Sequence, residues 1–377
     1  MQIVVDRNIR AAEATFGAHG RLHFMDGRTI RNEHLRAADV LLIRTATRVD
    51  EELLRGTPVR FVGSTSIGAD HLDLACLEAH GVAWANAPGC NADSAAQYTL
   101  AMAWLACERL RRDLPGMTAS VIGRGNVGSR VQALLRSLGM QVVANDPPLA
   151  DAGVTGLVSL EEALAQDLVC LHVPLTRSGA HATFRFIGRE QLTSMQPGTL
   201  LLNTARGDVV HGPALLAELE SGRLHAALDV WPGEPRIDAG LLRATTVATP
   251  HVAGYSDDGK RRGTLMVYEA FCRWAGLEPV APPPPPAAPP LLRIEPGRGM
   301  PGRALGQALD AACFVARHDA ALRALAELPV DQRARGFDRL RRDYPARRDF
   351  RAWRLQCPDL ESARLCHNMG FTTTVAP

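Results

Sequence analysis

Three glycines with a fixed spacing form the first pattern in the chain that indicates a specific chemistry. Gly123, Gly125 and Gly128 make a G-x-G-x-x-G sequence directly after the apolar run 119–122. Where a strand turns into a helix, the first glycine allows the tight turn. The second lets the backbone approach a pyrophosphate, and the third lets helix and strand pack closely. The N-terminus of the helix then faces the phosphates of a dinucleotide.

An acidic residue downstream of these glycines selects between the two nicotinamide dinucleotides. Asp146 follows the next predicted strand, 141–144, where its carboxylate can accept hydrogen bonds from the adenine ribose. The same carboxylate repels the 2′-phosphate of NADP, so NAD is the expected cofactor. No metal site is expected, because the eight cysteines are scattered without a metal-ligand spacing.

Three residues near the ends of later predicted strands suit acid–base chemistry on a hydroxy acid. Arg206 lies in the sequence NTARGD, Glu234 follows LDVWPG, and His251 lies in ATPHVAGY. Removal of a hydride from a carbon that bears a hydroxyl group needs a base at that hydroxyl and a cation at the adjoining carboxylate. Each residue alone is more often structural or solvated. Together, downstream of a dinucleotide fingerprint, they predict an active site.

With these sequences the chain resembles the D-isomer-specific 2-hydroxyacid dehydrogenases, from its N-terminus to about Ala275. The resemblance implies that Arg206 grips the carboxylate and the reacting oxygen of the substrate. It implies that His251 exchanges the hydroxyl proton, while Glu234 orients the imidazole and stabilises its charged form. The residues that the resemblance places at NAD are Gly123, Gly125, Asn126, Val127, Gly128, Asp146, Val173, Thr204, Ala205, Arg206, Asp229 and Gly254.

A closer likeness within this family rests on the segments VDRN, FVG, GADH, APGCN, DPP and HVAGY, and on YPARR near the C-terminus. It implies a small phosphorylated 2-hydroxy acid as the substrate. It places Thr45 and Ser66 at the substrate and Tyr255 near the far end of that molecule. Arg44 offers a cation for the phosphate. Arg347 and Arg348 are expected to be a solvated surface pair.

Short apolar runs alternate with helix-like stretches along most of the chain, which is typical of parallel sheets covered by helices. The predicted fold is α/β: a Rossmann-type doubly wound parallel sheet, a flavodoxin-like α/β substrate domain and a small α+β C-terminal domain. The predicted strands are 3–5, 40–44, 61–63, 82–85, 119–122, 141–144, 168–173, 200–204, 226–230, 246–248, 292–294, 353–356 and 372–375. Long helices are expected from Asn91 to Leu105 and over 258–274.

Composition shifts divide the chain into predicted domains. Residues 1–92 form a substrate (lid) domain to which 256–280 return, and 93–255 form the NAD-binding domain. Residues 281–290 are a proline-rich, extended linker. By resemblance, 291–377 form a dimerisation domain, so a homodimer is expected.

The charge balance excludes some partners. The formal net charge is +2 and no block of like charge stands out, so neither nucleic acid nor a membrane surface is expected as a partner. The scattered cysteines and the lack of a signal-like N-terminus favour a soluble, cytoplasmic protein with reduced thiols.

Two other functions remain open from the sequence. One is a different D-2-hydroxyacid dehydrogenase, such as phosphoglycerate dehydrogenase, which turnover of 3-phosphoglycerate would reveal. The other is a non-catalytic NAD-sensing binding protein. Retention of Arg206, Glu234 and His251 argues against the second, and a test for NADH production distinguishes it.

Overall fold

The computed structural model describes residues 1–295 and 302–376. Its contacts divide the chain into two compact units. The first unit is Met1–Asn91 with Ser256–Ala287, and the second is Ala92–Tyr255 with Ala288–Pro377. Each unit is described by itself. The predicted domain boundaries stay predictions. The contacts place the C-terminal segment with the NAD-binding segment.

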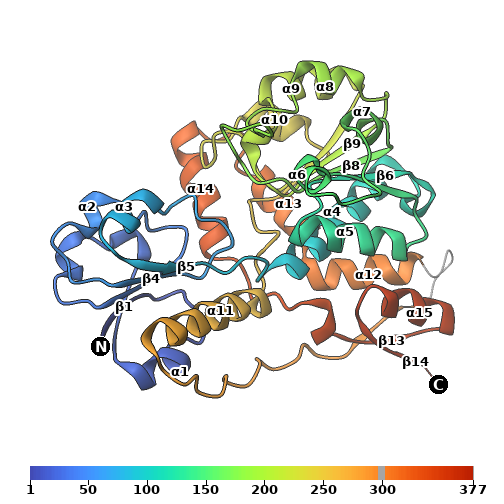
Figure 1. The fold of residues 1–377 in the computed structure, drawn as a ribbon. Helices are drawn as coiled ribbons and strands as arrows, with labels where there is room; N and C mark the ends of the chain where they lie inside the picture. The colour runs from blue at the N-terminus through green and yellow to red at the C-terminus, as the bar shows by residue number, and fades with distance from the viewer. Residues whose placement is uncertain (296–301, 377) are drawn as a thin grey trace. The chain divides into compact units, whose positions relative to one another are not determined.

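The first unit contains a five-stranded, fully parallel sheet in the order β2-β1-β3-β4-β5; β1, β4 and β5 are labelled in Figure 1. Its strands are β1 (Gln2–Asp6), β2 (Arg21–Met25), β3 (Val40–Ile43), β4 (Phe61–Ser64) and β5 (Ala83–Ala85). The order 2-1-3-4-5 is that of flavodoxin-like sheets, which confirms the predicted class of this part.

One strand of this sheet was not predicted. β2 lies at the sheet edge, and its side chains are exposed or half-buried throughout. Its sequence RLHFM lacks the continuous apolar run of a buried parallel strand, so periodicity alone gives no signal for it.

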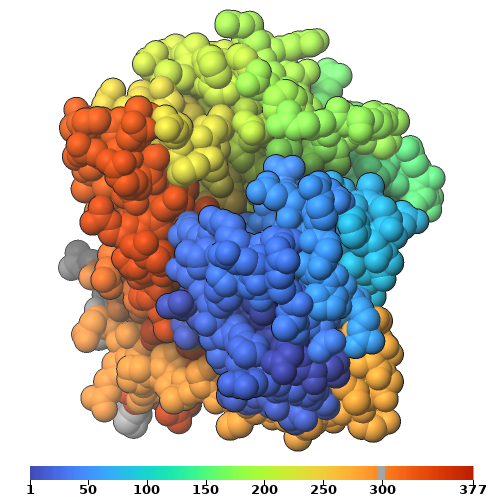
Figure 2. All heavy atoms as spheres, turned by 90° about the vertical axis from the view of Figure 1, so that its left-hand side faces the viewer, coloured from blue at the N-terminus to red at the C-terminus, as the bar shows by residue number. Residues whose placement is uncertain are grey.

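Helices cover both faces of the first sheet. Alternate strand residues point to opposite faces. Leu41 and Val62 pack under α2 (Glu51–Leu54) and α3 (Leu74–Ala79). On the other face Leu42 and Phe61 pack under α1 and α11. The bounds of these two are α1 (Ala12–Phe16) and α11 (Asp257–Ala275). Residues 1–91 form one continuous block of surface (blue to cyan in Figure 2).

The second unit contains a six-stranded parallel sheet in the order β11-β10-β9-β8-β6-β7. Its strands are β6 (Ala119–Ile122), β7 (Val142–Asn145), β8 (Leu168–Leu171), β9 (Leu200–Asn203), β10 (His225–Leu228) and β11 (Val247–Ala248). The chain adds β7 on one side of β6 and then crosses to add β8 on the other. Open α/β sheets bind ligands at such a switch point, outside the carboxyl ends of the strands.

Helices cover this sheet on both sides, and all six strands were predicted. The helices are α4 (Ala92–Leu110), α5 (Asn126–Ser137), α6 (Pro147–Asp151), α7 (Leu160–Leu164), α8 (Arg189–Ser194), α9 (Gly212–Glu220) and α10 (Ala239–Ala244). Both predicted long helices form. The first extends to Leu110, five residues beyond the prediction, and the second matches α11 to within one residue at each end.

Within the described residues, the C-terminal segment adds a three-stranded parallel sheet and four α-helices. The strands are β12 (Leu292–Arg293), β13 (Arg354–Cys357) and β14 (Thr372–Val375), and the helices are α12 (Gly302–Cys313), α13 (Val315–Arg323), α14 (Val330–Arg342) and α15 (Leu360–Asn368). Leu305 joins the core on the α4 and α5 side of the six-stranded sheet, and Phe337 joins the core on its other side. The predicted C-terminal domain includes 296–301 and Pro377, which lie outside the described residues.

Candidate active site

The glycine loop has the geometry that its spacing predicts. Gly123 has φ +91°, and a Cβ there would lie 2.7 Å from the carbonyl carbon of His172. A Cβ on Gly128 would lie 1.9 Å from the oxygen of Gly123, so only glycine lets α5 approach the loop this closely. A Cβ on Gly125 would meet nothing within 4 Å. That open space is where backbone can approach a pyrophosphate.

Asp146 directly follows β7, and its carboxylate is hydrogen-bonded to the glycine loop. One carboxylate oxygen accepts from the N–H of Arg124 at 2.7 Å, and the other accepts from the N–H of Leu149 at 3.1 Å, which caps α6. The half-buried carboxylate thus lies beside the loop that is predicted to face the phosphates. Each of its oxygens has a further lone pair for a ribose hydroxyl.

The other residues predicted at NAD gather at the carboxyl ends of the strands. Val173 follows β8, and Thr204 and Ala205 follow β9. The hydroxyl groups of Thr204 and Thr99 form a hydrogen bond of 2.9 Å. Asn126 and Val127 form the first turn of α5, and Gly254 lies in the loop before α11.

His172, which the sequence reasoning did not single out, also ends β8. Its Nε2 is buried and has no partner within the described residues. Burial lowers the pKa of this imidazole to about 3, so the ring is neutral. A buried polar atom without a partner is exceptional. Its place beside Gly123 fits a ligand that completes this end of the sheet.

Glu234 and His251 form a hydrogen-bonded pair. Nδ1 of His251 contacts Oε1 of Glu234, and Oε2 accepts from the N–H of Trp231 at 3.1 Å. Burial alone would raise the pKa of the Glu234 carboxyl. His251, Arg341 and the Trp231 N–H outweigh that effect, and the pKa lies below its ordinary value. The carboxylate is therefore charged near neutral pH and directs Nε2 of His251 away from itself.

Asp229, predicted near the nicotinamide, holds the turn that carries His251. It is fully buried. Its Oδ1 accepts from the hydroxyl of Thr249 at 2.6 Å and from the N–H of Val252 at 2.9 Å. Its Oδ2 accepts from the N–H of Ala253 at 2.9 Å. His251 has φ +56°, a left-handed conformation that needs support from its surroundings.

Arg206 follows β9 on a turn held by Asn203. The buried amide of Asn203 accepts from the N–H of Ala205 and donates to the carbonyl of Arg206, both at 3.0 Å. A Cβ on the next residue, Gly207, would lie 2.0 Å from the carbonyl of Trp231. The turn thus packs directly against the segment that follows β10. The half-buried Arg206 is positioned by Asn203 on one side and by the packing of Gly207 on the other.

The predicted substrate residues of the first unit share one sheet edge. Arg44 and Thr45 directly follow β3, and Ser66 follows the adjacent β4. Thr45 is exposed, while Arg44 and Ser66 are half-buried. The hydroxyl of Ser64 is buried and bonded to Nε2 of His71 at 2.9 Å.

Arg347 corrects an expectation from the sequence. It is not a solvated surface residue, since it is only 2% exposed. Its guanidinium donates to the carbonyls of Tyr255 at 2.9 Å, Ala253 at 2.6 Å and Ser94 at 3.1 Å, and it lies over the ring of Tyr98. Arg347 is therefore a buried structural cation that ties both ends of the NAD-binding segment to the C-terminal segment.

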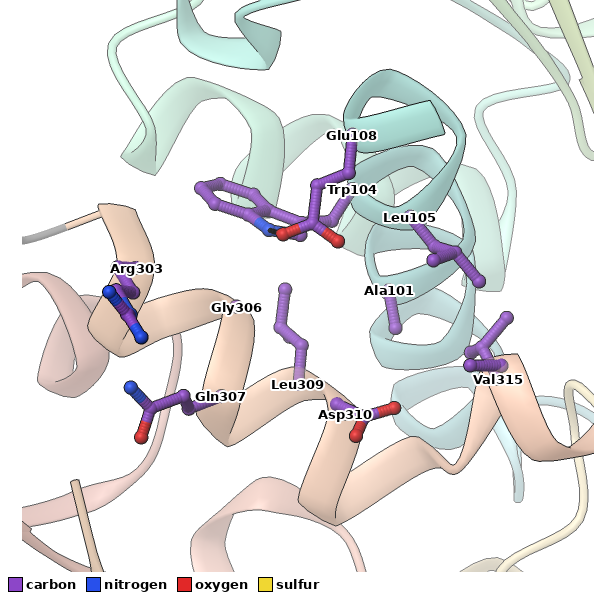
Figure 3. A pocket seen from close by; sticks show the side chains of 11 residues that line it. Ala101, Trp104, Leu105, Glu108, Arg303, Gly306, Gln307, Leu309, Asp310 and Val315 are labelled. Carbon is purple, nitrogen blue, oxygen red and sulfur yellow. Dashed lines mark hydrogen bonds between the residues drawn. The ribbon is translucent and has the colours of Figure 1, made fainter. Parts of the chain in front are cut away.

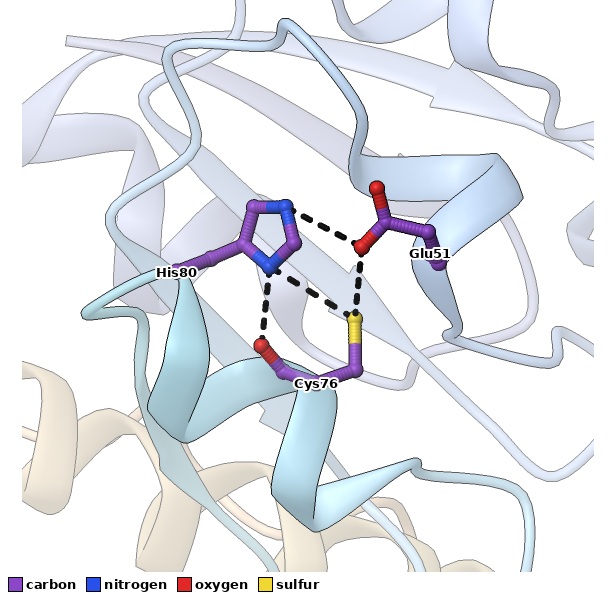
Figure 4. Close-up of side chains that lie close together, drawn as sticks. All are labelled: Glu51, Cys76 and His80. Carbon is purple, nitrogen blue, oxygen red and sulfur yellow. Dashed lines mark hydrogen bonds and ion pairs between the residues drawn. The ribbon is translucent and has the colours of Figure 1, made fainter.

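Two other features lie apart from these residues. A groove of about 380 Å³ runs between α4 and α12 (Figure 3), where Gly306 lets the helices approach. No predicted site residue lines it. In the first unit, Glu51, Cys76 and His80 point toward one another (Figure 4). Within the described residues, no helix is long and apolar enough to cross a membrane.

Comparison with known proteins places this geometry in a family. The family model for the NAD binding domain of D-isomer specific 2-hydroxyacid dehydrogenases matches residues 90–253. The erythronate-4-phosphate dehydrogenase of Hahella chejuensis is 42% identical over 354 residues, 93% of each chain. The enzyme of that name from Azotobacter vinelandii is 43% identical, over 94% of this chain and 95% of its own. The chain belongs to the D-isomer specific 2-hydroxyacid dehydrogenase family.

A solved structure agrees with this assignment. The D-lactate dehydrogenase of Aquifex aeolicus, complexed with NAD and lactic acid, is 25% identical with a TM-score of 0.62. The match covers 73% of this chain and 96% of that one. The chain is accordingly an NAD-dependent oxidoreductase, and the cradle formed by the glycine loop and Asp146 suits that cofactor.

Proposed function

We propose that this enzyme oxidises 4-phospho-D-erythronate at C2 to (R)-3-hydroxy-2-oxo-4-phosphooxybutanoate, with NAD as acceptor, in pyridoxal phosphate (vitamin B6) biosynthesis. The observation that carries the proposal is the extent of the match to the two erythronate-4-phosphate dehydrogenases. It reaches 93% of the chain or more, whereas D-lactate dehydrogenase matches 73%.

The His251–Glu234 pair supplies the proton chemistry of this reaction. Because Nδ1 of His251 is paired with the Glu234 carboxylate, Nε2 carries the lone pair that accepts the C2 hydroxyl proton. The charged carboxylate then stabilises the imidazolium that forms. As the proton leaves, the C2–O bond becomes a carbonyl and the hydrogen on C2 leaves as hydride. NAD, when bound, accepts that hydride.

Arg206 supplies the positive charge at the reacting end. The α-carboxylate of the substrate and the oxygen at C2 both carry negative charge or gain it during oxidation. A guanidinium can donate to both at once. The bonds from Asn203 and the close packing of Gly207 hold Arg206 at the carboxyl end of β9. This is the sheet end that holds the glycine loop and the His251 turn.

A substrate panel followed by NADH absorbance tests the proposal. We expect kcat/KM to be highest for 4-phosphoerythronate and lower by at least 10²-fold for erythronate and for 3-phosphoglycerate. For erythronate, which lacks the phosphate, such a loss corresponds to one or two missing charge-assisted hydrogen bonds. Equal turnover of erythronate and its 4-phosphate refutes the phosphorylated substrate. A preference for 3-phosphoglycerate would mean that the enzyme is instead a phosphoglycerate dehydrogenase.

We further propose that the C-terminal segment forms a homodimer interface. Two large apolar side chains of this segment, Leu360 and Val375, are 56% and 42% exposed. Val375 lies on β14, an edge strand of the three-stranded sheet. Light scattering of the full chain should give a dimer mass, and Leu360→Glu with Val375→Glu should shift it toward a monomer. A monomeric wild type contradicts the proposal.

A cytoplasmic location is also proposed, because all eight cysteines are free and buried. Free thiols are typical of reducing compartments. Fractionation of the cells that produce the enzyme tests it, and enzyme outside the cytoplasmic fraction contradicts it.

A further inference from the structure

Arg341, near the end of α14, has far fewer hydrogen bonds than a guanidinium can make. Arginine carries five N–H donors. The hydrogen bond that Arg341 makes runs from Nη2 to the hydroxyl oxygen of Tyr255, at 3.4 Å. Its Nε is buried and has no partner, and within the described residues no carboxylate oxygen lies within 4.0 Å of it. Arg341 as a whole is half-buried, and arginines withdrawn from solvent are ordinarily paired with an anion, which this one is not within the described residues.

The position of Arg341 relates it to the proton-transfer pair. Its guanidinium carbon lies 6.0 Å from the ring centroid of Tyr255, which follows His251 by four residues. Its charge helps to lower the pKa of the Glu234 carboxyl, so the two groups interact. Tyr344, on the same C-terminal segment, packs its ring edge-on against Tyr255 at 5.6 Å between centroids. Its hydroxyl is also buried without a partner within the described residues.

We propose that Arg341 binds the phosphate of the substrate and that the Tyr344 hydroxyl is a second donor to it. The inference rests on the proposed function. A phosphate ester dianion presents several acceptor oxygens, and the planar guanidinium fork can donate to two of them at once. Only two carbon–carbon bonds and an ester oxygen separate C2 of the proposed substrate from its phosphorus. The phosphate must therefore lie near the His251 turn, where the guanidinium of Arg341 supplies a positive charge that has no paired anion.

Substrate discrimination by Arg341→Gln tests the inference. We expect kcat/KM for 4-phosphoerythronate to fall by about 10- to 100-fold, the equivalent of one charge-assisted hydrogen bond. Activity on erythronate should change by less than about threefold, because that molecule has no phosphate to lose. Arg341→Lys should recover part of the loss, and Tyr344→Phe should show a smaller loss in the same direction. Arg342→Gln is the matched control, since the exposed Arg342 on the same helix pairs with Asp343.

Several outcomes overturn the inference. An equal loss on both substrates shows that Arg341 acts on Glu234 and not on the phosphate. An unchanged preference for the phosphorylated substrate shows that the phosphate binds elsewhere, while the proposed function stands. If the wild type itself shows no preference, the proposed function fails before any variant is made. Should Arg341→Gln fold poorly, the Arg341→Lys and Tyr344→Phe variants decide the question by the same ratio.

A different observation carries a second inference, in the first unit. Cys76 lies within α3, His80 directly follows that helix four residues later, and Glu51 is the first residue of α2 (Figure 4). The Cys76 Sγ lies 3.8 Å from Oε2 of Glu51, and Nε2 of His80 lies 3.3 Å from the same oxygen. Ligand atoms of all three residues lie within 4.8 Å of one another.

Two of these separations, 3.3 Å and 3.8 Å, are close to those between the ligand atoms of a zinc ion. Zinc bonds to sulfur, nitrogen and oxygen of about 2.0–2.3 Å in a tetrahedron place neighbouring ligand atoms roughly 3.3–3.6 Å apart. Nδ1 of His80 lies 2.9 Å from the carbonyl oxygen of Cys76, to which it can donate. Such a bond fixes the tautomer and leaves the Nε2 lone pair facing Glu51, as in metal-binding histidines.

We propose that Glu51, Cys76 and His80 bind one Zn²⁺ ion, with water as the fourth ligand. Glu51 and His80 are partly exposed, so the ion can enter from solvent. Because α2 supplies one ligand and α3 the other two, bound zinc cross-links the two helices on one face of the five-stranded sheet. The predicted role is stabilisation of the first unit.

Metal binding by the chelator-treated full-length enzyme tests this site. Calorimetric titration should give one Zn²⁺ per chain, with release of the Cys76 thiol proton. Co²⁺ should produce thiolate charge-transfer absorption. Cys76→Ser and His80→Ala should each weaken zinc binding by at least 10-fold and abolish or diminish that absorption. Cys272→Ser, a buried cysteine of the same unit, and Glu52→Gln are matched controls that should bind normally. No zinc binding, or binding unchanged in Cys76→Ser, refutes the site.

Discussion

Replacing Asp229 by asparagine tests the claim that this carboxylate holds the turn of His251. The amide oxygen can keep the two bonds that Oδ1 accepts from Thr249 and Val252. The amide nitrogen then faces the N–H of Ala253, which loses its acceptor. One unsatisfied buried donor costs about 1–3 kcal/mol, and loss of charge assistance in the other two bonds adds about 1 kcal/mol each. The variant should therefore be less stable by about 3–5 kcal/mol.

Activity should fall as well, because displacement of a catalytic group by about 1 Å can reduce turnover by 10²-fold. Urea unfolding, kcat from NADH absorbance and the Kd for NAD measure the three effects separately. Asp167→Asn is the control. Asp167 accepts the N–H and hydroxyl of Thr118, both at 2.9 Å, at the opposite ends of β6 and β8. The Asp167→Asn enzyme should be less stable than the wild type but should keep its kcat. An Asp229→Asn enzyme with normal kcat refutes the reasoning, even if NAD binds more weakly.

Three further substitutions examine the predicted roles. His251→Ala should lower kcat by about 10²–10⁴-fold while NAD affinity, measured by fluorescence, is kept, and near-normal turnover would exclude His251 as the base. Glu234→Gln should shift the acid limb of the pH–rate profile to lower pH, because the imidazolium loses its partner, and an unmoved profile contradicts that role. The pKa of Glu234 in the folded protein lies below its ordinary value of 4.5. The ionised carboxylate therefore stabilises the wild type above pH 4.5, and this contribution is lost as the pH falls below 4.5, whereas Glu234→Gln has no such contribution to lose. Asp146→Ala should reduce the preference for NAD over NADP in kcat/KM. Equal use of both cofactors by the wild type would mean that Asp146 does not select.

Local sequence patterns determine most of the fold. The buried strands β6, β8 and β9 are continuous apolar runs, so their positions follow from the sequence. The glycine loop is equally local in sequence, and two of its glycines, Gly123 and Gly128, leave no room for a Cβ in the fold. The edge strand β2 escapes prediction because it buries no side chain fully. The pairing of Glu234 with His251 came from family resemblance and not from any local pattern.

Contacts between distant segments could not be foreseen. The carbonyl groups to which Arg347 donates belong to residues more than 90 positions away. Nothing in YPARR distinguishes the buried Arg347 from its half-buried neighbour Arg348. Arg341 likewise meets Tyr255 across 86 positions, and in the sequence it is one of several arginines on an arginine-rich helix. An arginine is buried or solvated according to the acceptors that the fold assembles, which no short window contains.

The burial of Arg347 makes this enzyme hard to shorten. Aquifex aeolicus D-lactate dehydrogenase is covered almost completely by three quarters of this chain, which suggests that the C-terminal segment is an appendage. Yet a chain cut after the proline-rich linker keeps Arg206, Glu234 and His251 and loses the donor for three carbonyls, two of them beside the His251 turn. A nonsense mutation or proteolytic nick far downstream will therefore resemble an active-site lesion in an activity assay. Genetic screens for inactive alleles should recover C-terminal truncations alongside substitutions of the catalytic residues.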